Sequence, residues 1–264
     1  MLNGIRLIRV IEMKTPAQID MMRETGRVVA RALEAMQQAA QIGVTLKEID
    51  AVGAQVLADA GATSPFLNYH PDWSPVPFPG STCTSVNDAI VHGIPTDYAI
   101  ADGDLVSLDF GAVLNGWCGD SARSFIVGTP RPGDQELIDV TKAALDAGIA
   151  AAQVGNTIGD IGYAVSKLAR KARYGNLEDH GGHGIGTEMH MDPFVPNEGR
   201  RGKGLKLTPG LVIAIEPMFI ADGRSDYKHD ADGWTLRTVR GARAAHWEHT
   251  IAITEAGPRI LTAL

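Results

Sequence analysis

Four acidic residues lie next to apolar stretches that are typical of buried strands, where a carboxylate is costly unless something positive neutralises it. Asp109 follows Leu-Val-Ser-Leu, and Glu216 follows Leu-Val-Ile-Ala-Ile. Asp120 and Glu248 each stand close to the start of a further apolar stretch. Four carboxylates at one point would repel one another, so they would need raised pKa values or bound cations. Two divalent metals about 3.5–4 Å apart, bridged by carboxylates and a hydroxide, would neutralise them.

Two histidines accompany these acids, His92 and His183, and each begins a His-Gly-Ile triplet. A donor set rich in oxygen with one imidazole suits Mn, Fe, Co or Zn, and the affinity order alone does not choose among them. The residue types therefore predict a dinuclear metal site that performs hydrolysis.

The chain repeats the same features in the same order. Each half has two helices, a His-Gly-Ile turn, a strand that ends in an acid, and a second strand with an acid. The matching segments are 42–49 with 154–161, 92–94 with 183–185, 103–109 with 210–216, and Asp120 with Glu248. Because the order holds while the spacing drifts, the sequence predicts two similar halves, about 15–128 and 129–264, around a pseudo-two-fold axis.

Helices are predicted from capping residues and apolar spacing. Thr15-Pro16 begins one helix, and the capping box from Thr45 to Glu48 begins another. Helical patterns return at 134–153 and 157–173, and a strand is predicted at 211–220, followed by a β region to residue 254.

A hairpin is predicted between a strand at 105–110 and a return strand that ends near residue 127, because Asn115-Gly116 is a strong turn signal. A two-residue turn would place Asp109 opposite Ala122 and make Asp120 its diagonal neighbour on the same face. That diagonal is roughly 7–8 Å, so both carboxylates could reach ions between them.

The composition is that of a globular protein: 264 residues, of which 44% are hydrophobic and 21% charged. A net charge of −7 argues against nucleic acid or an anionic membrane as the main partner.

Cys83 and Cys118 are too few for a disulfide framework and suggest free thiols in a reducing cytoplasm. No apolar run is long enough to span a membrane. Residues 1–14 lack the unbroken apolar centre of a signal peptide and are predicted to be a short extension or an edge strand.

Each residue alone has a simpler explanation. Asp109 could be a turn acid, Glu216 a strand-exit residue before proline, and His183 an incidental member of a glycine-rich turn. Those glycines could also resemble a phosphate loop, but no Gly-Lys-Ser follows. His190 could lie on the surface, and we expect three further histidines to be solvated, namely His229, His246 and His249.

The motifs together resemble the type I methionine aminopeptidases, over nearly the whole chain from about Thr15 to Thr262. The resemblance implies an α+β pita-bread fold, in which helices cover the outside of a pseudo-two-fold antiparallel sheet in a single catalytic domain, residues 15–264. It rests on segments 91–95, 108–110, 119–120, 182–186, 214–218 and 247–250, and on His190.

The resemblance implies five metal ligands and two divalent ions, with Co, Mn, Fe and Zn all left open. Asp109 would chelate one metal, and Asp120 and Glu248 would bridge the pair. His183 and Glu216 would complete the shell of the other metal.

The resemblance also implies the catalytic and binding residues. Glu216 would act as general base, and His92 and His190 would contact the scissile amide and stabilise the oxyanion. Segment 71–77, which includes Trp73, is longer than its equivalent in the family and lies within a loop at 65–80 that contains five prolines. The methionine pocket would consist of Phe66, Tyr69, Phe78, Cys83, Met189 and Trp234, with Met189 at a position where the family usually has an aromatic residue.

The implied function is removal of the N-terminal methionine from proteins and peptides with a small second residue. The enzyme would be a cytoplasmic monomer that meets peptides and nascent chains near the ribosome, with no specific nucleic acid and no membrane as partner. One alternative is an Xaa-Pro aminopeptidase or dipeptidase of the same fold, although those usually carry a large extra domain before the catalytic one. The other is a non-catalytic pita-bread binding protein, although such relatives have lost metal ligands.

Overall fold

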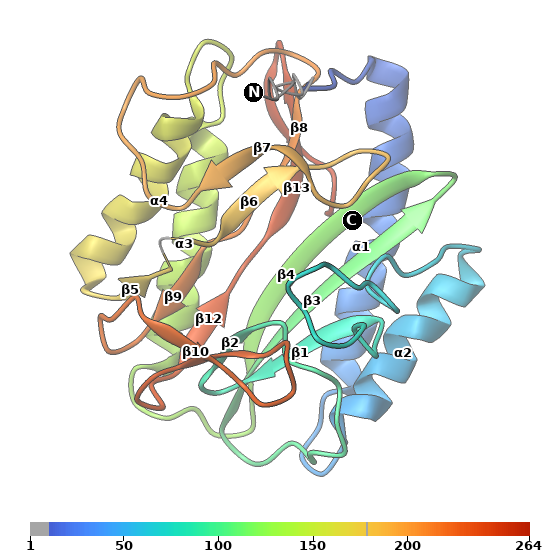
Figure 1. The fold of residues 1–264 in the computed structure, drawn as a ribbon, viewed down its shortest axis with the longest axis vertical. Helices are drawn as coiled ribbons and strands as arrows, with labels where there is room; N and C mark the ends of the chain where they lie inside the picture. Colours follow the sequence, from blue (N-terminus) through green and yellow to red (C-terminus); the bar gives the residue numbers. More distant parts are fainter. Residues whose placement is uncertain (1–10, 178) are drawn as a thin grey trace, which may run out of the picture.

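A computed structural model describes residues 11–177 and 179–264. Residues 1–10 of the predicted N-terminal extension lie outside the described residues, and residues 11–15 form no regular element. Helices α1 and α2 lie on one side of the strands and α3 and α4 on the other (Figure 1). The helices are α1 (Pro16–Ala39), α2 (Leu46–Asp59), α3 (Asp134–Ala151) and α4 (Ile158–Ala172).

All the strand ladders among the described residues are antiparallel, so the predicted α+β class is confirmed. The first half contributes β1 (Thr82–Val86), β2 (Ala89–Val91), β3 (Asp104–Leu114) and β4 (Trp117–Val127). The second half contributes β5 (Gly175–Asn176), β6 (Gly181–Gly184), β7 (Met191–Pro196), β8 (Val212–Ile215), β9 (Met218–Ile220), β10 (Tyr227–His229), β11 (Leu236–Thr238), β12 (Ala244–His246), β13 (His249–Thr254) and β14 (Gly257–Ile260).

The helices begin at the residues that the sequence indicates. The Thr45 hydroxyl accepts a hydrogen bond from the backbone N–H of Glu48, and the Glu48 carboxylate accepts one from the backbone N–H of Thr45 at 2.7 Å. Thr15 and Gln18 make the equivalent pair at the start of α1. These reciprocal bonds satisfy N–H groups that have no partner within the helix, and so they fix where each helix starts.

The β3–β4 hairpin has the predicted register. Asn115 and Gly116 have positive φ angles of 51° and 80°, as the two-residue turn requires. Asp109 therefore lies opposite Ala122, and Asp120 lies opposite Gly111. Strand β1 pairs with the other edge of β3, so the first half has the strand order β1-β3-β4.

The second half repeats this arrangement with β6, β8 and β13 as neighbours in one sheet. The prediction of a single strand over 211–220 is wrong, because β8 ends before Glu216 and β9 begins after Pro217. Proline has no N–H to donate to a ladder, which explains the break. Glu216 thus stands at the exit of β8 rather than within a strand.

Glycine allows α1 to approach the end of the chain closely. A Cβ atom on Gly26 would lie 2.3 Å from the carbonyl oxygen of Leu261, and one on Gly119 would lie 3.3 Å from the backbone nitrogen of Gly26. Helix α1 therefore packs against both β4 and the segment after β14. A hydrophobic cluster under α1 and α2 and another under α3 and α4 complete the core.

The two halves meet where β4 lies beside the start of β13. The Thr250 hydroxyl accepts from the backbone N–H of Asp120 at 3.0 Å and donates to the Asp120 carbonyl at 2.8 Å. The backbone N–H of Glu248 donates to the Ala122 carbonyl at 3.0 Å, and the Ser121 hydroxyl donates to the Glu248 carbonyl at 2.6 Å. This β4–β13 seam brings one acid from each half together.

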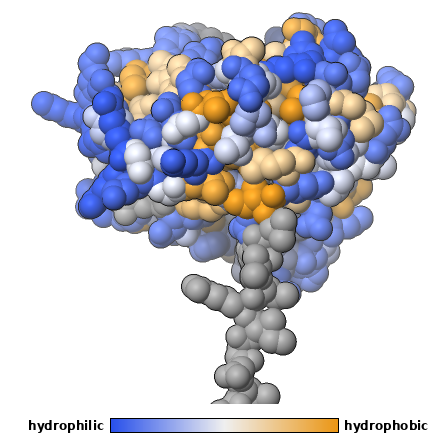
Figure 2. All heavy atoms as spheres, turned by 90° about the horizontal axis from the view of Figure 1, so that it is seen from above, coloured by the Kyte–Doolittle hydropathy of each residue, from blue (hydrophilic) through white to orange (hydrophobic). Residues whose placement is uncertain are grey.

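The surface is mostly hydrophilic on the face that Figure 2 shows, with hydrophobic side chains in small groups between the polar ones. Within residues 11–177 and 179–264, none of the helices combines the length and apolar character needed to cross a bilayer.

We expect Thr250→Val to destabilise the protein by about 1–3 kcal/mol, because it leaves the buried N–H and carbonyl of Asp120 without their shared partner. Urea unfolding of the metal-free protein measures the loss. Thr254→Val on the same strand is the control, since its hydroxyl bonds Gly257 in a less buried place. Equal losses for the two variants would contradict the role given to the seam.

Candidate metal centre

Five side chains that are far apart in the sequence converge at the seam. Asp109 comes from β3, Asp120 from β4 and His183 from β6, while Glu216 follows β8 and Glu248 precedes β13. Ligand atoms of Asp120, His183 and Glu248 lie within 4.8 Å of one another. His183 Nε2 is 3.8 Å from Asp120 Oδ2 and 3.8 Å from Glu216 Oε1. The structure thus brings the predicted ligand set together around a shared space.

The His183 ring is oriented as in a metal ligand. Its Nδ1 lies 2.9 Å from the carbonyl oxygen of Gly184, to which it donates, so Nε2 keeps its lone pair toward the carboxylates. Burial, with a smaller effect from the nearby His190, lowers the pKa of His183 to about 3. The imidazole is therefore neutral at physiological pH, as metal binding requires.

The neighbours of the acids in the described part of the chain include histidines but no cationic side chain. Among the described residues, no Lys or Arg forms an ion pair with the four carboxylates. Burial raises the pKa of Asp109 to about 7. Burial and the neighbouring acids also raise the pKa values of Asp120, Glu216 and Glu248.

Three oxygens of this cluster are buried and have no hydrogen-bond partner, namely Asp109 Oδ1, Asp120 Oδ1 and Glu248 Oε1. Buried polar atoms are rarely left unpaired. Divalent cations would satisfy these oxygens and neutralise the acids, so the residues fit a carboxylate-bridged metal site with one imidazole.

An apolar cavity of about 250 Å³ opens beside the acidic cluster. Met189 does not line it: the residue is buried, and its Cε lies 2.3 Å from where a Cβ on Gly111 would be. The other predicted pocket residues do line the cavity, and these are Phe66, Tyr69, Phe78, Cys83 and Trp234.

His92 and His190 line the apolar cavity together with the acidic cluster. His92 has a left-handed backbone (φ 60°), and its buried Nδ1 has no hydrogen-bond partner. The His190 side chain is exposed, and its ring centroid lies 4.5 Å from that of His183. Both imidazoles are thus available to a bound molecule.

A second, more polar cavity of about 190 Å³ lies on the other side of these residues. It shares His92, Asp109, His183, His190 and Glu216 with the first cavity. The residues that line only the second cavity are Val91, Asp179, His180, Gly181, Phe194, Met218 and His246.

Sequence reasoning missed His180 and His246. The prediction that His246 is solvated is wrong, because its side chain is 2% exposed and its Nε2 lies 3.7 Å from Glu216 Oε2. Its position after two alanines in a short apolar strand was the available signal. His249 is half-buried and hydrogen-bonds Thr262 Oγ1 at 2.8 Å, whereas His229 is exposed as predicted.

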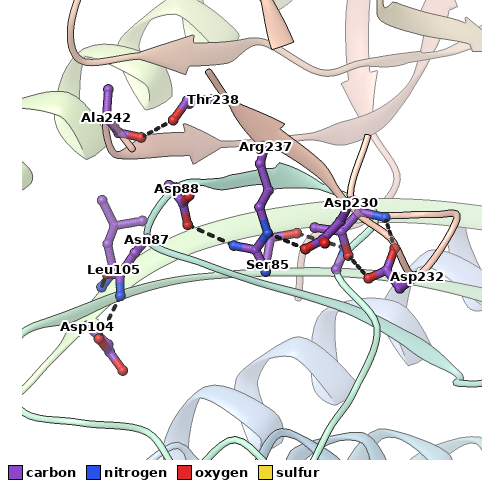
Figure 3. Close-up of polar contacts among 12 residues, drawn as sticks. Ser85, Asn87, Asp88, Asp104, Leu105, Asp230, Asp232, Arg237, Thr238 and Ala242 are labelled. Carbon is purple, nitrogen blue, oxygen red and sulfur yellow. Dashed lines mark hydrogen bonds and ion pairs between the residues drawn. The ribbon is translucent and has the colours of Figure 1, made fainter. Parts of the chain in front are cut away.

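Hydrogen bonds and ion pairs outside the apolar cavity stabilise its wall. The Arg237 guanidinium donates to Asp88 Oδ1 at 2.7 Å and also to Asp230 (Figure 3). Asp232 Oδ1 accepts from the backbone N–H of Trp234 at 2.8 Å. These bonds join β11 to the residues before β2, and so they hold Trp234 near His92, which follows β2.

Comparison with known proteins defines the family. The sequence profile of metallopeptidase family M24 matches residues 20–255. Methionine aminopeptidase 1 of Mycobacterium tuberculosis is 46% identical over 99% of this chain and 98% of its own length. The Bacillus subtilis methionine aminopeptidase 1 is 41% identical over 94% of this chain and 98% of its own. The chain belongs to the type I methionine aminopeptidases of family M24.

Solved structures confirm the pita-bread fold of this metallopeptidase. The methionine aminopeptidase of Thermotoga maritima superimposes with a TM-score of 0.92 at 36% identity, over 97% of this chain and all of that one. The prolidase of Pyrococcus furiosus has a TM-score of 0.74 at 23% identity and shares the fold, but this chain covers 65% of its length. The family also confirms that the chain is a hydrolase that uses divalent metal ions.

We expect Mn²⁺ to bind about tenfold or more weakly at pH 6 than at pH 8. The raised carboxyl pKa values mean that protons remain on the cluster at pH 6 and must leave before the ion binds, whereas at pH 8 more of the acids are ionised. Titration calorimetry on metal-free protein measures the affinity, and circular dichroism at both pH values controls for folding. An affinity that is equal at both would contradict the assignment.

Proposed function

We propose that the chain removes the N-terminal methionine from peptides and proteins whose second residue is small. The observation that supports this most directly is the apolar, aromatic-lined cavity that ends at the acidic cluster. A flexible thioether side chain suits such a pocket. The polar cavity on the other side leaves room for the rest of the peptide, so the scissile bond would lie over the cluster.

The metal-binding residues would be Asp109, Asp120, His183, Glu216 and Glu248. When bound, two divalent ions lower the pKa of water and polarise the scissile carbonyl. Asp120 and Glu248, which come from opposite sides of the seam and have ligand atoms within 4.8 Å of each other, would both hold the ions. Glu216 would take a proton from the attacking water and pass it to the leaving amine. Its place at the exit of β8, next to both cavities, supports that role.

His92 and His190 would donate hydrogen bonds to the scissile amide and to the oxyanion that forms from it. Loss of hydration between the walls of the two cavities lowers the pKa of both rings, that of His92 to about 4, although His190 keeps part of its surface exposed. Both rings are therefore neutral, and each carries one N–H. A neutral donor stabilises the developing negative charge without pairing permanently with the acids nearby.

The acidic cluster also explains why only the first residue would be removed. A free α-amine is cationic or a metal ligand, and the carboxylates at the inner end of the apolar cavity would hold it there. A longer chain before the scissile bond would have to place an uncharged amide among those acids. We further propose a cytoplasmic monomer that acts on nascent chains near the ribosome, with residues 15–264 as its catalytic domain.

A peptide panel tests the proposed activity. Metal-free protein should be inactive and should regain the release of methionine from Met-Ala-Ser as Mn²⁺, Co²⁺, Fe²⁺ or Zn²⁺ is added back in steps. Peptides with a large second residue should be poor substrates. Preference for Xaa-Pro bonds would favour the prolidase alternative, and absence of hydrolysis with every metal would favour a binding protein.

Asp120→Asn should lower kcat for Met-Ala-Ser by about a hundredfold or more while the protein stays folded, because an amide cannot supply the charge of a bridging carboxylate. Asp139→Asn on the surface of α3 is the matched control and should behave as wild type. Wild-type activity of Asp120→Asn with metal supplied would refute the ligand assignment.

A further inference from the structure

Segment 71–77 carries a large aromatic side chain at the mouth of the apolar cavity. Trp73 lines the cavity, yet its side chain remains 56% exposed. Its ring lies 6.4 Å from that of His92 with an angle of 24° between the planes, and 4.9 Å from that of Trp234 in an edge-on contact. Trp73 thus stands over the place where the methionyl pocket meets the catalytic histidine.

The segment is held in place although it has no helix or strand. The backbone N–H of Phe78 donates to the Tyr69 carbonyl at 2.8 Å, which closes the loop at its base. The Trp234 indole N–H donates to the Val76 carbonyl at 2.9 Å. A Cβ on Gly233 would lie 2.6 Å from Pro75, so the loop packs directly on the turn that carries Trp234.

These contacts leave more than half of Trp73 exposed. Its ring stacks near that of His92 and makes an edge-to-face contact with that of Trp234, and the remaining surface faces water. A tryptophan that is more than half exposed gains little stability for the fold, whereas a ligand in the cavity could cover its free surface. No hydrogen bond of the Trp73 side chain is present among the described residues, and the bonds that hold the segment include those of Phe78 and Trp234.

We propose that Trp73 is a substrate-binding residue that forms the outer wall of the methionyl pocket. This inference rests on the proposed function and adds to it a contact that the neighbouring pocket residues do not provide. The indole covers the methionyl residue from the solvent side while Phe66 and Phe78 enclose it from within. Its stacking on His92 places it close to the scissile amide, so it contacts the first residue of the peptide and also shields it from water.

The experiment compares Trp73→Ala, Trp73→Phe and a control, Leu67→Ala, in the metal-loaded enzyme. Leu67 is 47% exposed in the same loop but does not line the cavity. For each variant, KM and kcat for Met-Ala-Ser, the inhibition constant of free methionine and the thermal midpoint are measured.

We expect Trp73→Ala to raise KM and the methionine inhibition constant by about tenfold, with kcat changed less than about twofold and an unchanged thermal midpoint. Trp73→Phe should restore most of the lost affinity for the peptide and for methionine, and Leu67→Ala should match wild type. An unchanged KM overturns the proposal. So does a lower thermal midpoint with altered kcat but unchanged methionine binding, which would indicate a structural role. Failure of the wild type to cleave Met-Ala-Ser would instead refute the proposed function.

Discussion

The central constraint on the structure is the mutual repulsion of four carboxylates, which the fold holds close together and away from water. Asp109, Asp120, Glu216 and Glu248 have raised pKa values, and three of their oxygens lack partners. Such a cluster opposes folding unless protons or cations occupy it. The remainder of the molecule therefore has to supply enough packing to hold the acids in place, and the helices on either side do so through the two large hydrophobic clusters.

The seam between β4 and β13 explains how two halves make one centre. Each half alone positions two acids on neighbouring strands, but only hydrogen bonds across the seam set the distance between Asp120 and Glu248. The two pseudo-equivalent histidines, however, have different orientations and surroundings. His183 turns its Nε2 toward the acids, whereas its counterpart His92 has a left-handed backbone and lies between the two cavities.

Much of this could be predicted from the sequence where local rules apply. The turn at Asn115 and Gly116 determines the hairpin register, and the capping threonines determine the helix starts, because both involve residues within a few positions of one another. The environment of His246 could not be predicted in this way. Its burial depends on β9 and on Glu216, which are brought to it by tertiary contacts. Met189 likewise packs its side chain into the space beside Gly111 and is absent from the cavity lining.

The seam also has a consequence for how the enzyme is made. Asp120 and Thr250 are 130 residues apart, so a ribosome that has synthesised the first half has delivered two acids and none of their counterparts. No intermediate length of nascent chain assembles the active centre before β13 is available. The acids of the first half therefore stay without their partners until residues 248–250 have been synthesised and have paired with β4.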